Sequence, residues 1–418
     1  MASKLEIASS CAPVSTRARD GDSCKLRACR PTQRGVRLGS KTQGCKRFSR
    51  SEFPPRCFHS HRQMTVKATS TTSATVESPI TAPPNNPLGF RNQFWKWRGQ
   101  TVRYQALNEE GTGPSVVLIH GLFVNCDHWR KNMQPLADAG YRVFAIDLLG
   151  CGYSSKPDPY GEEARKLSGE NGRPLGAPEA TLGTAGGGSR AAAVALAHPL
   201  GSCYNFYTWA EQVCDFSEQV VRPPDGRVAL VSNSIGTITA LQAAVDQPEL
   251  VSGVLTVNPN FRELHTAETP SFAVPAIQWV QAQLRKYGQR VFDAAANPKT
   301  VKQILKEPYN VESAVTDELV DVLLTPLLTP GASTVVFDQL SYSAGPLPEQ
   351  LLQDERLAAP VWVCWGEKDP WTPPKRVLAL ERYESVRELV TLPNVGHCPH
   401  DEAPDLVNPV IIDFLKTL

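Results

Sequence analysis

The stretch from Val228 to Gly236 constrains the fold of this chain more than any other. Its first four residues are an apolar run of strand length, and its last five, Ser232 to Gly236, are a turn of mostly small residues. The residues that follow, Thr237 to Val245, are typical of a helix. A strand, a tight turn and a helix in this order are what a nucleophile elbow requires, and they predict one here.

In such an elbow the central residue has its side chain exposed above the sheet, which makes Ser234 the candidate nucleophile. The backbone amide of Ile235 would face the same space from the helix N-terminus. Gly236 supplies the small neighbour that close packing of strand and helix needs, but Ser232 stands where the usual pattern has its first glycine. Without further support, an ordinary strand-to-helix turn is an alternative.

Strand-like apolar runs alternate with helical stretches along most of the chain. Besides the run before Ser234, we expect strands at 116–119, 142–146, 253–257, 361–365 and 388–392. Residues 94–107 predict an antiparallel hairpin at a sheet edge, with its turn at 98–100. We expect helices from near Asn132 to Gly140, from 207 to 221 and from 405 to 418. This alternation predicts an α/β fold with a mainly parallel sheet covered by helices on both faces.

Two long segments interrupt the pattern. Residues 158–202 are rich in Gly and Ala and lack periodicity, which predicts a disordered surface insertion; translated non-coding sequence is the alternative. Residues 262–350 contain helical spacings such as Ile277, Val280 and Leu284, which predict a helical lid between two strands. Any single apolar residue of that region could equally well pack as core.

The N-terminal residues differ in composition from the rest. Residues 1–67 carry 15 Lys and Arg but only 4 Asp and Glu, and they have no long apolar core. This predicts an organelle transit peptide processed near Lys67, followed by a linker at 68–88 and a single α/β domain at 89–418. A basic arm that binds nucleic acid is the alternative, but the segment has few aromatic residues and no recognisable motif, so we expect no nucleic-acid partner.

Cysteine usage and hydropathy limit the other possibilities. Of eleven cysteines, five lie in residues 1–67, and the remaining six include no C-x-x-C pair. We therefore expect neither a zinc site nor a disulfide framework, and no cofactor or metal. The chain has no uninterrupted run of about 18 apolar residues, so no segment is expected to span a membrane.

A serine hydroxyl needs a base and a group that orients the base. Asp369 follows the strand at 361–365, and His397 follows the strand at 388–392. All three candidates come after strands, where open α/β sheets place their sites, and the order Ser234, Asp369, His397 is the one that α/β-hydrolases use. We expect Ser234 to attack an ester carbonyl, His397 to take and return the proton, and Asp369 to hold the imidazole.

The strand at 116–119 ends in His120-Gly121-Leu122. The backbone amides of Leu122 and Ile235 are therefore expected to bind the oxyanion.

Other polar and aromatic residues have weaker interpretations. Glu367 is a rival for the acid, although it lies nearer the strand end. Asp147 is expected to be structural. His400, beside two acidic residues, is expected at a solvated helix start, and His128 and Trp129 either line an entrance or pack.

From about residue 90 onward the chain resembles the α/β-hydrolase superfamily, and within it the plant and algal chloroplast group that contains chlorophyll dephytylase, with pheophytinase more distant. The motifs that carry the resemblance are His120-Gly121, Asp127 to Arg130, Gly150 to Ser154, Tyr207 to Trp209, Asn233 to Gly236, Trp365 to Trp371 and Leu392 to Pro399.

The resemblance implies a chloroplast serine hydrolase that cleaves the phytyl ester of chlorophyll to chlorophyllide and phytol. An apolar lid would suit the isoprenoid chain, and a peripheral contact with the thylakoid membrane would follow from where this apolar ester resides. Open alternatives are hydrolysis of pheophytin or another carboxylic ester, and a hydrolase-like ligand receptor with negligible turnover. Ser234 argues against dehalogenase or epoxide hydrolase chemistry, which uses an aspartate nucleophile in this superfamily.

Overall fold

The computed structural model describes residues 82–168, 201–262, 272–342 and 344–418. The expected transit segment, most of the expected linker and residues 169–200 of the expected insertion lie outside the described residues.

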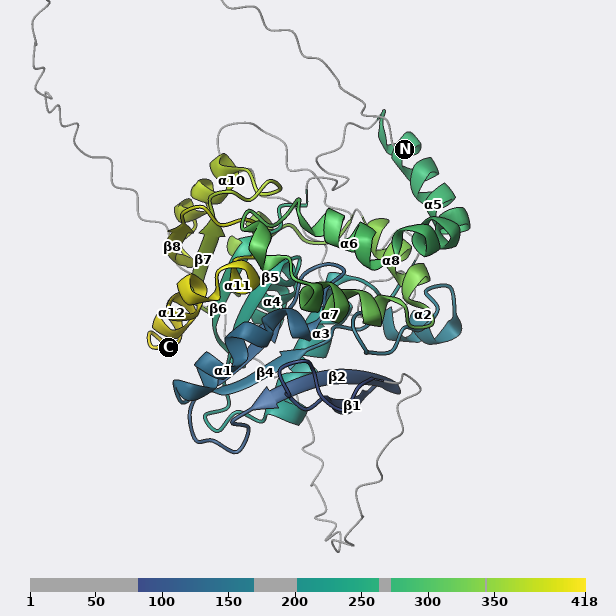
Figure 1. Cartoon of the computed structure of the whole chain (residues 1–418). Coiled ribbons are helices and arrows are strands. Elements are labelled where there is room, and N and C mark those ends of the chain that lie inside the picture. The colour runs from purple at the N-terminus through teal and green to yellow at the C-terminus, as the bar shows by residue number, and fades with distance from the viewer. Residues whose placement is uncertain (1–81, 169–200, 263–271, 343) are drawn as a thin grey trace, which may run out of the picture. The chain divides into compact units, whose positions relative to one another are not determined.

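One mixed sheet organises the described residues, with strands in the order β1-β2-β4-β3-β5-β6-β7-β8 (Figure 1). The strands are β1 (Gln93–Trp97), β2 (Gln100–Leu107), β3 (Ser115–Ile119), β4 (Arg142–Ile146), β5 (Val228–Ser234), β6 (Val251–Pro259), β7 (Val361–Gly366) and β8 (Val386–Leu392). The expected hairpin is β1 and β2, at the edge; β1 with β2 and β2 with β4 pair antiparallel, and the other neighbours pair parallel. The predicted mainly parallel sheet is confirmed.

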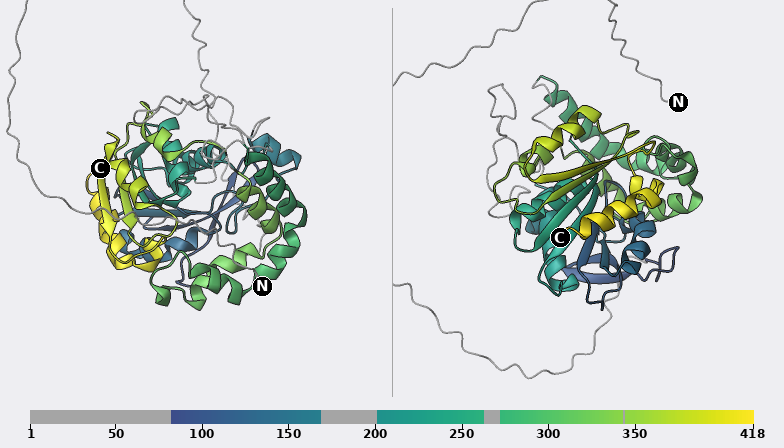
Figure 2. Two further views of the ribbon diagram at one scale, coloured as in Figure 1. Left: turned by 90° about the horizontal axis from the view of Figure 1, so that it is seen from above. Right: turned by 90° about the vertical axis from the view of Figure 1, so that its left-hand side faces the viewer.

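Helices cover both faces of this sheet (Figure 2). They are α1 (Arg130–Asp138), α2 (Glu162–Ser168), α3 (Phe206–Phe216), α4 (Gly236–Asp246), α5 (Val274–Ala295), α6 (Pro298–Leu305), α7 (Asp317–Leu327), α8 (Ala332–Leu340), α9 (Pro348–Leu352), α10 (Pro374–Leu378), α11 (Pro399–Glu402) and α12 (Pro404–Leu415), with short turns η1 (Cys126–Trp129), η2 (Ser217–Val221), η3 (Glu312–Ala314) and η4 (Ala379–Arg382).

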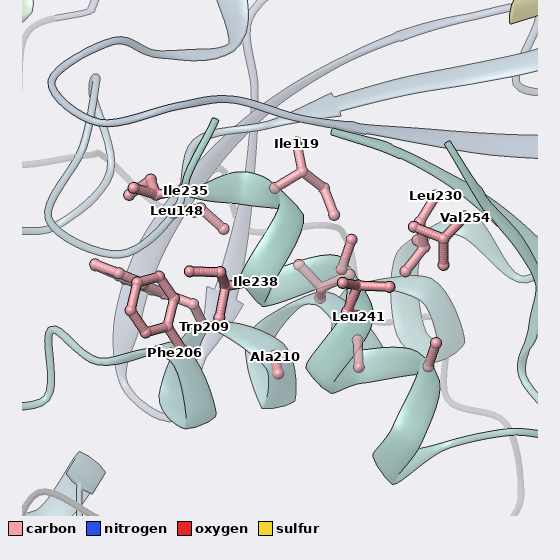
Figure 3. Packing of buried hydrophobic residues seen from close by; sticks show 14 of the residues in the cluster. Ile119, Leu148, Phe206, Trp209, Ala210, Leu230, Ile235, Ile238, Leu241 and Val254 are labelled. Atoms are coloured by element: carbon pink, nitrogen blue, oxygen red, sulfur yellow. The ribbon is translucent and has the colours of Figure 1, made fainter. Parts of the chain in front are cut away.

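The two faces of the sheet bury separate apolar cores because successive strand residues point to opposite sides. In β3, Val117 and Ile119 join the core under α3 and α4, whereas Val116 and Leu118 join the core under α1 and α12. Figure 3 shows the first of these cores, with α4 lying between the strands and α3. Helix α4, which follows the elbow, therefore packs against the sheet on one side and against α3 on the other.

Helix α1 begins at Arg130, two residues before the expected start near Asn132. The turn η1 precedes it directly, capped by Asn125, whose side chain accepts a hydrogen bond from Asp127 N. Pro135 therefore lies inside the helix, where it leaves the carbonyl four residues earlier without its usual donor. Asn408 Nδ2 donates to that carbonyl, of Lys131, at 3.3 Å.

Between β6 and β7 the chain forms α5 to α9, and we call α5 to α8 the lid helices. Helix α5 packs against α8, and α6 packs against α7. A small third core joins α7, through Leu319 and Leu323, to Tyr309 and Cys398. Within the described ranges no single helix is long and apolar enough to cross a membrane; α7 and α8, bent by 96°, meet the length and composition test only together.

The beginning of the expected insertion is ordered, contrary to the prediction of disorder for 158–202. Residues 162–168 form α2, which buries Ala164 and Leu167 against the main core. The amphipathic spacing of these two residues was hidden by the Gly-rich composition of the residues that follow them.

Candidate active site

Ser234 is the last residue of β5 and has a left-handed backbone, with φ of +54°. This conformation is strained for a residue with a side chain, and it persists only where the surroundings impose it. The register between β5 and β6 shifts at Asn233 and Ser234, and α4 begins two residues later at Gly236. The expected strand-to-helix turn is therefore present, with Ser234 at its apex and only 7% of its surface exposed.

Close backbone contacts explain which positions of the turn need glycine. A β-carbon at Gly236 would lie 2.6 Å from the carbonyl oxygen of His120, and one at Gly121 would lie 3.2 Å from the β-carbon of Ser234. The loop after β3 thus lies directly against the elbow. The side chain of Ser232 instead donates to the carbonyl of Leu255 on β6 at 3.3 Å, so a serine is accommodated where the usual motif has glycine.

Asp369 and His397 form a buried pair, with 2.7 Å between Oδ2 of the aspartate and Nδ1 of the imidazole. Asp369 also accepts from Asn258 Nδ2 at 2.7 Å and from the amides of Trp371 and Thr372 at 2.8 and 3.2 Å. Burial alone would raise the pKa of Asp369, but the hydrogen bonds from His397, Thr372 and Asn258 outweigh it and leave the pKa below its ordinary value.

This pairing settles the tautomer of His397. An ionised Asp369 can only accept, so Nδ1 of His397 carries a proton, and in the neutral imidazole the lone pair is on Nε2. Nε2 is buried and has no hydrogen-bond partner among the described residues. Such a nitrogen is available to take a proton from a neighbouring hydroxyl.

Two asparagines join the ends of four neighbouring strands. Asn233, next to Ser234, donates to the carbonyl of His397 at 3.2 Å and to that of Val257 at 3.0 Å. Asn258, on β6, donates to Asp369 and accepts from the amide of Gly366 at the end of β7. The structure therefore brings Asp369 and His397 into direct contact and ties the backbone of His397 to the residue before Ser234.

The two amides expected to bind an oxyanion lie in the loop after β3 and at the start of α4. Ile235 is the N-cap of α4, so its amide belongs to a helix end where N–H groups lack intrahelical acceptors. Leu122 follows Gly121, where an added β-carbon would lie 3.2 Å from the β-carbon of Ser234. His120 holds this loop: Nδ1 donates to the Gly121 carbonyl at 2.7 Å, and Nε2 accepts from Leu148 N at 3.0 Å. Burial lowers the pKa of His120, so this structural imidazole is neutral.

The rival acids have different surroundings from Asp369. Glu367 is exposed to solvent. Asp147 is fully buried in an ion pair with Arg103, as its structural interpretation expected.

Sequence reasoning missed the ring that covers the imidazole. Trp371, two residues after Asp369, packs its ring at 4.7 Å from that of His397 while 44% of its surface stays exposed. The available signals were its position next to the acid and its place at the end of the motif Trp365 to Trp371.

The expectation of a solvated helix start at His400 is wrong. His400 and Asp401 are fully buried, and Glu402 is nearly so. The reason is that α11 packs against η1 and α1, where Arg130 lies 2.7 Å from Asp401 and supplies the opposite charge.

His128 and Trp129 are buried as well, so of their two interpretations packing holds. The Trp129 ring lies 4.2 Å from that of His400. Among the residues that the structure describes, no cluster of three or more His, Cys, Asp or Glu side chains could hold a metal ion.

Comparison with known proteins agrees with the fold. Chloroplastic pheophytinase of Arabidopsis thaliana is 26% identical over 320 residues, which cover 73% of this chain but only 62% of that protein. The AB hydrolase superfamily protein YfhM of Bacillus subtilis (strain 168) is 22% identical over 340 residues, covering 78% of this chain and 99% of YfhM. A solved structure of a serine hydrolase involved in carbazole degradation, the CarC enzyme, is similar in fold, with a TM-score of 0.55 and 18% identity. The match covers 79% of this chain and 100% of that chain.

The alpha/beta hydrolase family model matches residues 116–410, which include the elbow, both loops of the buried pair and the lid helices. This match spans well over half of the sequence, and the chain belongs to the alpha/beta hydrolase family.

Proposed function

We propose that this chain is a serine hydrolase of carboxylic esters, with Ser234, His397 and Asp369 as its catalytic triad. The observation that carries the proposal is the buried pair of Asp369 and His397, which leaves Nε2 free at the edge of the sheet where Ser234 is held in a strained turn.

The mechanism follows from the atoms in place. Nε2 of His397 takes the proton of the Ser234 hydroxyl as its oxygen attacks the ester carbonyl, and then gives it to the leaving alcohol. Asp369 keeps Nδ1 protonated and stabilises the imidazolium that forms. The amides of Leu122 and Ile235 stabilise the oxyanion, each contributing roughly 3 to 4 kcal/mol. Water then hydrolyses the acyl-enzyme by the same proton transfers in reverse.

For the substrate we propose the phytyl ester of chlorophyll, with chlorophyllide and phytol as products in the chloroplast. The similarity to a chloroplastic pheophytinase over 73% of the chain supports a pigment ester. The same similarity makes pheophytin, the magnesium-free pigment, the second candidate. The basic, acid-poor composition of residues 1–67 supports import into the organelle.

A peripheral contact with thylakoid lipids is part of this proposal, and α5 is the surface that supports it. The helix packs on α8 through Gly288, where a β-carbon would lie 2.4 Å from the Phe337 ring. Trp279 and Tyr287 on α5, and Phe272, two residues before the helix begins at Val274, carry exposed aromatic side chains. Lys286 lies over the Tyr287 ring at 5.2 Å. Exposed aromatic and basic side chains on one helix are typical of helices that lie at a membrane interface.

Flotation with vesicles of thylakoid lipid tests this contact. The wild-type protein is expected to float with the vesicles, and Trp279→Ser is expected to float less. Leu406→Ser, which removes another exposed apolar side chain, from α12 (45% exposed, against 65% for Trp279), is the control and should float like the wild type. Equal flotation of all three proteins would contradict a role for α5.

The function itself is tested by product analysis. The full-length chain is incubated with chlorophyll a, pheophytin a and a short nitrophenyl ester, beside Ser234→Ala and Ser232→Ala. We expect chlorophyllide from the wild type and from Ser232→Ala, and none from Ser234→Ala. Release of pheophorbide alone would favour the second candidate, and turnover of only the short ester would remove the pigment assignment. No turnover, together with no labelling of Ser234 by a fluorophosphonate, would favour a ligand receptor.

A further inference from the structure

The segment Glu307–Val311, which joins α6 to η3 and which we call the clamp segment, lies directly against the loop that carries His397. The amide of His397 donates to the carbonyl of Pro308 at 2.7 Å. A β-carbon at Gly396 would lie 2.3 Å from the same carbonyl oxygen and 2.8 Å from Asn310 N. The two backbones therefore touch with no room for a side chain between them.

Side chains fasten this contact at both ends. Oε1 of Glu402 accepts from the amide of Gly396 at 3.0 Å and from those of Asn310 and Val311 at 3.0 and 2.7 Å. At the other end, Trp371, whose ring packs on His397, donates from Nε1 to Glu307 at 3.0 Å. The clamp segment thus contacts the loop that carries His397 in three ways: through its backbone, through the carboxylate of Glu402, and through Trp371.

Tyr309 anchors the middle of the clamp segment in the protein interior. Its hydroxyl lies 2.9 Å from Oδ2 of Asp401 and 2.8 Å from Nε2 of His128. Asp401 forms a buried ion pair with Arg130, so it is ionised and can only accept. The Tyr309 hydroxyl must therefore donate to Asp401 and accept from His128.

The direction of the hydrogen bond between His128 and Tyr309 fixes the direction of the next one, between His400 and His128. Because Nε2 of His128 carries its proton, its Nδ1 accepts from Nε2 of His400 at 3.1 Å. Burial lowers the pKa of His128 to about 3 and that of His400 well below its ordinary value, so both rings are neutral, as this pattern requires. Only one arrangement of protons satisfies these hydrogen bonds, and His400 follows His397 by three residues.

We propose that Tyr309 is a positioning residue for His397: by fixing the clamp segment against the loop of residues 396–402, it holds the imidazole where it can take the proton of Ser234. The proposal rests on the serine hydrolase chemistry proposed above, but not on the pigment substrate. Tyr309 lies between lid helices α6 and α7. The lid region would therefore help to position the catalytic base.

Tyr309→Phe tests the proposal with the short nitrophenyl ester. It removes the hydroxyl and keeps the ring. We expect kcat to fall between about 10-fold and 100-fold, because a small displacement of a catalytic base is costly, while KM changes by less than about twofold. The matched control is Tyr104→Phe, which removes a hydroxyl that bonds Gln93 at 3.1 Å near the far edge of the sheet. The control should retain kcat. A similar fall in both variants, or a change in KM alone, would overturn the proposal.

A double-mutant cycle separates positioning from general destabilisation. If Tyr309 acts through His397, Tyr309→Phe should not reduce further the residual turnover of His397→Ala. A reduction of the same factor in both backgrounds would show that Tyr309 acts independently of the imidazole, and the proposal would fail.

A second readout needs no turnover at all. In protein labelled with nitrogen-15 at histidine, the Nδ1–H signal of His397 reports its hydrogen bond to Asp369. We expect Tyr309→Phe to shift or broaden this signal and Tyr104→Phe to leave it unchanged. If the wild type hydrolyses no ester, the proposed function fails while this spectrum still decides the role of Tyr309. An unchanged signal in Tyr309→Phe would overturn the positioning role.

Discussion

Asp147 and Asp369 occupy equivalent places at opposite sides of the sheet: each follows the carboxyl end of a parallel strand, β4 and β7 respectively. Each is buried and accepts several hydrogen bonds, and the pKa of each lies below its ordinary value. Asp147 receives both Nε and Nη2 of Arg103, at 2.6 and 3.0 Å, and the amides of Cys126 and Tyr153. Asp369 receives an imidazole instead.

The difference between these two partners decides what each carboxylate can do. Arg103 is permanently charged, and its guanidinium donates to Asp147, Asp127 and Asn125. All three of its nitrogens are therefore hydrogen-bonded within the protein. His397 has a second ring nitrogen: Asp369 binds Nδ1, and Nε2 has no hydrogen-bond partner among the described residues. A strand-end aspartate is therefore structural when it faces a guanidinium and can serve chemistry when it faces an imidazole.

The largest effect is expected from Asp369→Asn. The amide can donate to Nδ1, which stabilises the wrong tautomer and leaves Nε2 protonated. We expect kcat to fall about 10⁴-fold, as loss of the orienting carboxylate does in other serine hydrolases. Nitrophenyl ester kinetics measures this fall, and thermal unfolding should show only a small change. A fall in kcat of less than about tenfold would remove Asp369 from the triad.

Asp147→Asn should have the opposite effects: a large loss of stability and little change in kcat. It leaves the fully buried Arg103 without one of its charged partners, and breaking a buried pair in this way costs about 3 to 5 kcal/mol. Urea unfolding monitored by circular dichroism measures the loss. The kcat per folded molecule should stay close to that of the wild type. A large loss of kcat with unchanged stability would place Asp147 in the chemistry and would contradict its structural role.

The stability gap between the wild type and Asp147→Asn should depend on pH. Burial alone would raise the pKa of Asp147, but the charge and hydrogen bonds of Arg103 outweigh it, so the folded-state pKa lies below that of an unfolded aspartate, about 3.9. The stabilisation is therefore fully present above about pH 5 and is lost as pH falls through the folded-state pKa. Urea unfolding at pH 7, 5, 4 and 3 should show a constant gap that narrows below pH 4. A gap that widens in acid would contradict this assignment.

The sequence predicted most of the fold because the parallel strands are nearly continuous apolar runs bounded by turn residues. Strands such as β3 need no partner information to be recognised. The incorrect predictions concern places where residues far apart in the sequence determine the local structure. The start of α1 depends on the preceding turn, and the partner of the carbonyl that Pro135 leaves free is Asn408, far along the chain.

The candidate site shows the same limit. The order of Ser234, Asp369 and His397 along the chain indicated the elbow and the two loops, because each follows a strand. The cluster around His400 could not be found in this way, since acidic neighbours normally indicate a solvated helix start. Its burial depends on Arg130, Tyr309 and His128, which come from two other parts of the chain.

The smallest effect is expected from Glu367→Gln, which tests the two carboxylates of a single loop against each other. Glu367 and Asp369 lie two residues apart after β7, and either carboxylate could have served as the acid on sequence grounds alone. The structure exposes Glu367, whereas Asp369 is buried against His397. An exposed carboxylate without contact to the imidazole cannot hold its tautomer, so Glu367→Gln should change kcat by less than about twofold. Nitrophenyl ester kinetics beside Asp369→Asn measures the contrast. Equal losses in the two variants would mean that general negative charge near His397, rather than the hydrogen bond from Nδ1, supports the base.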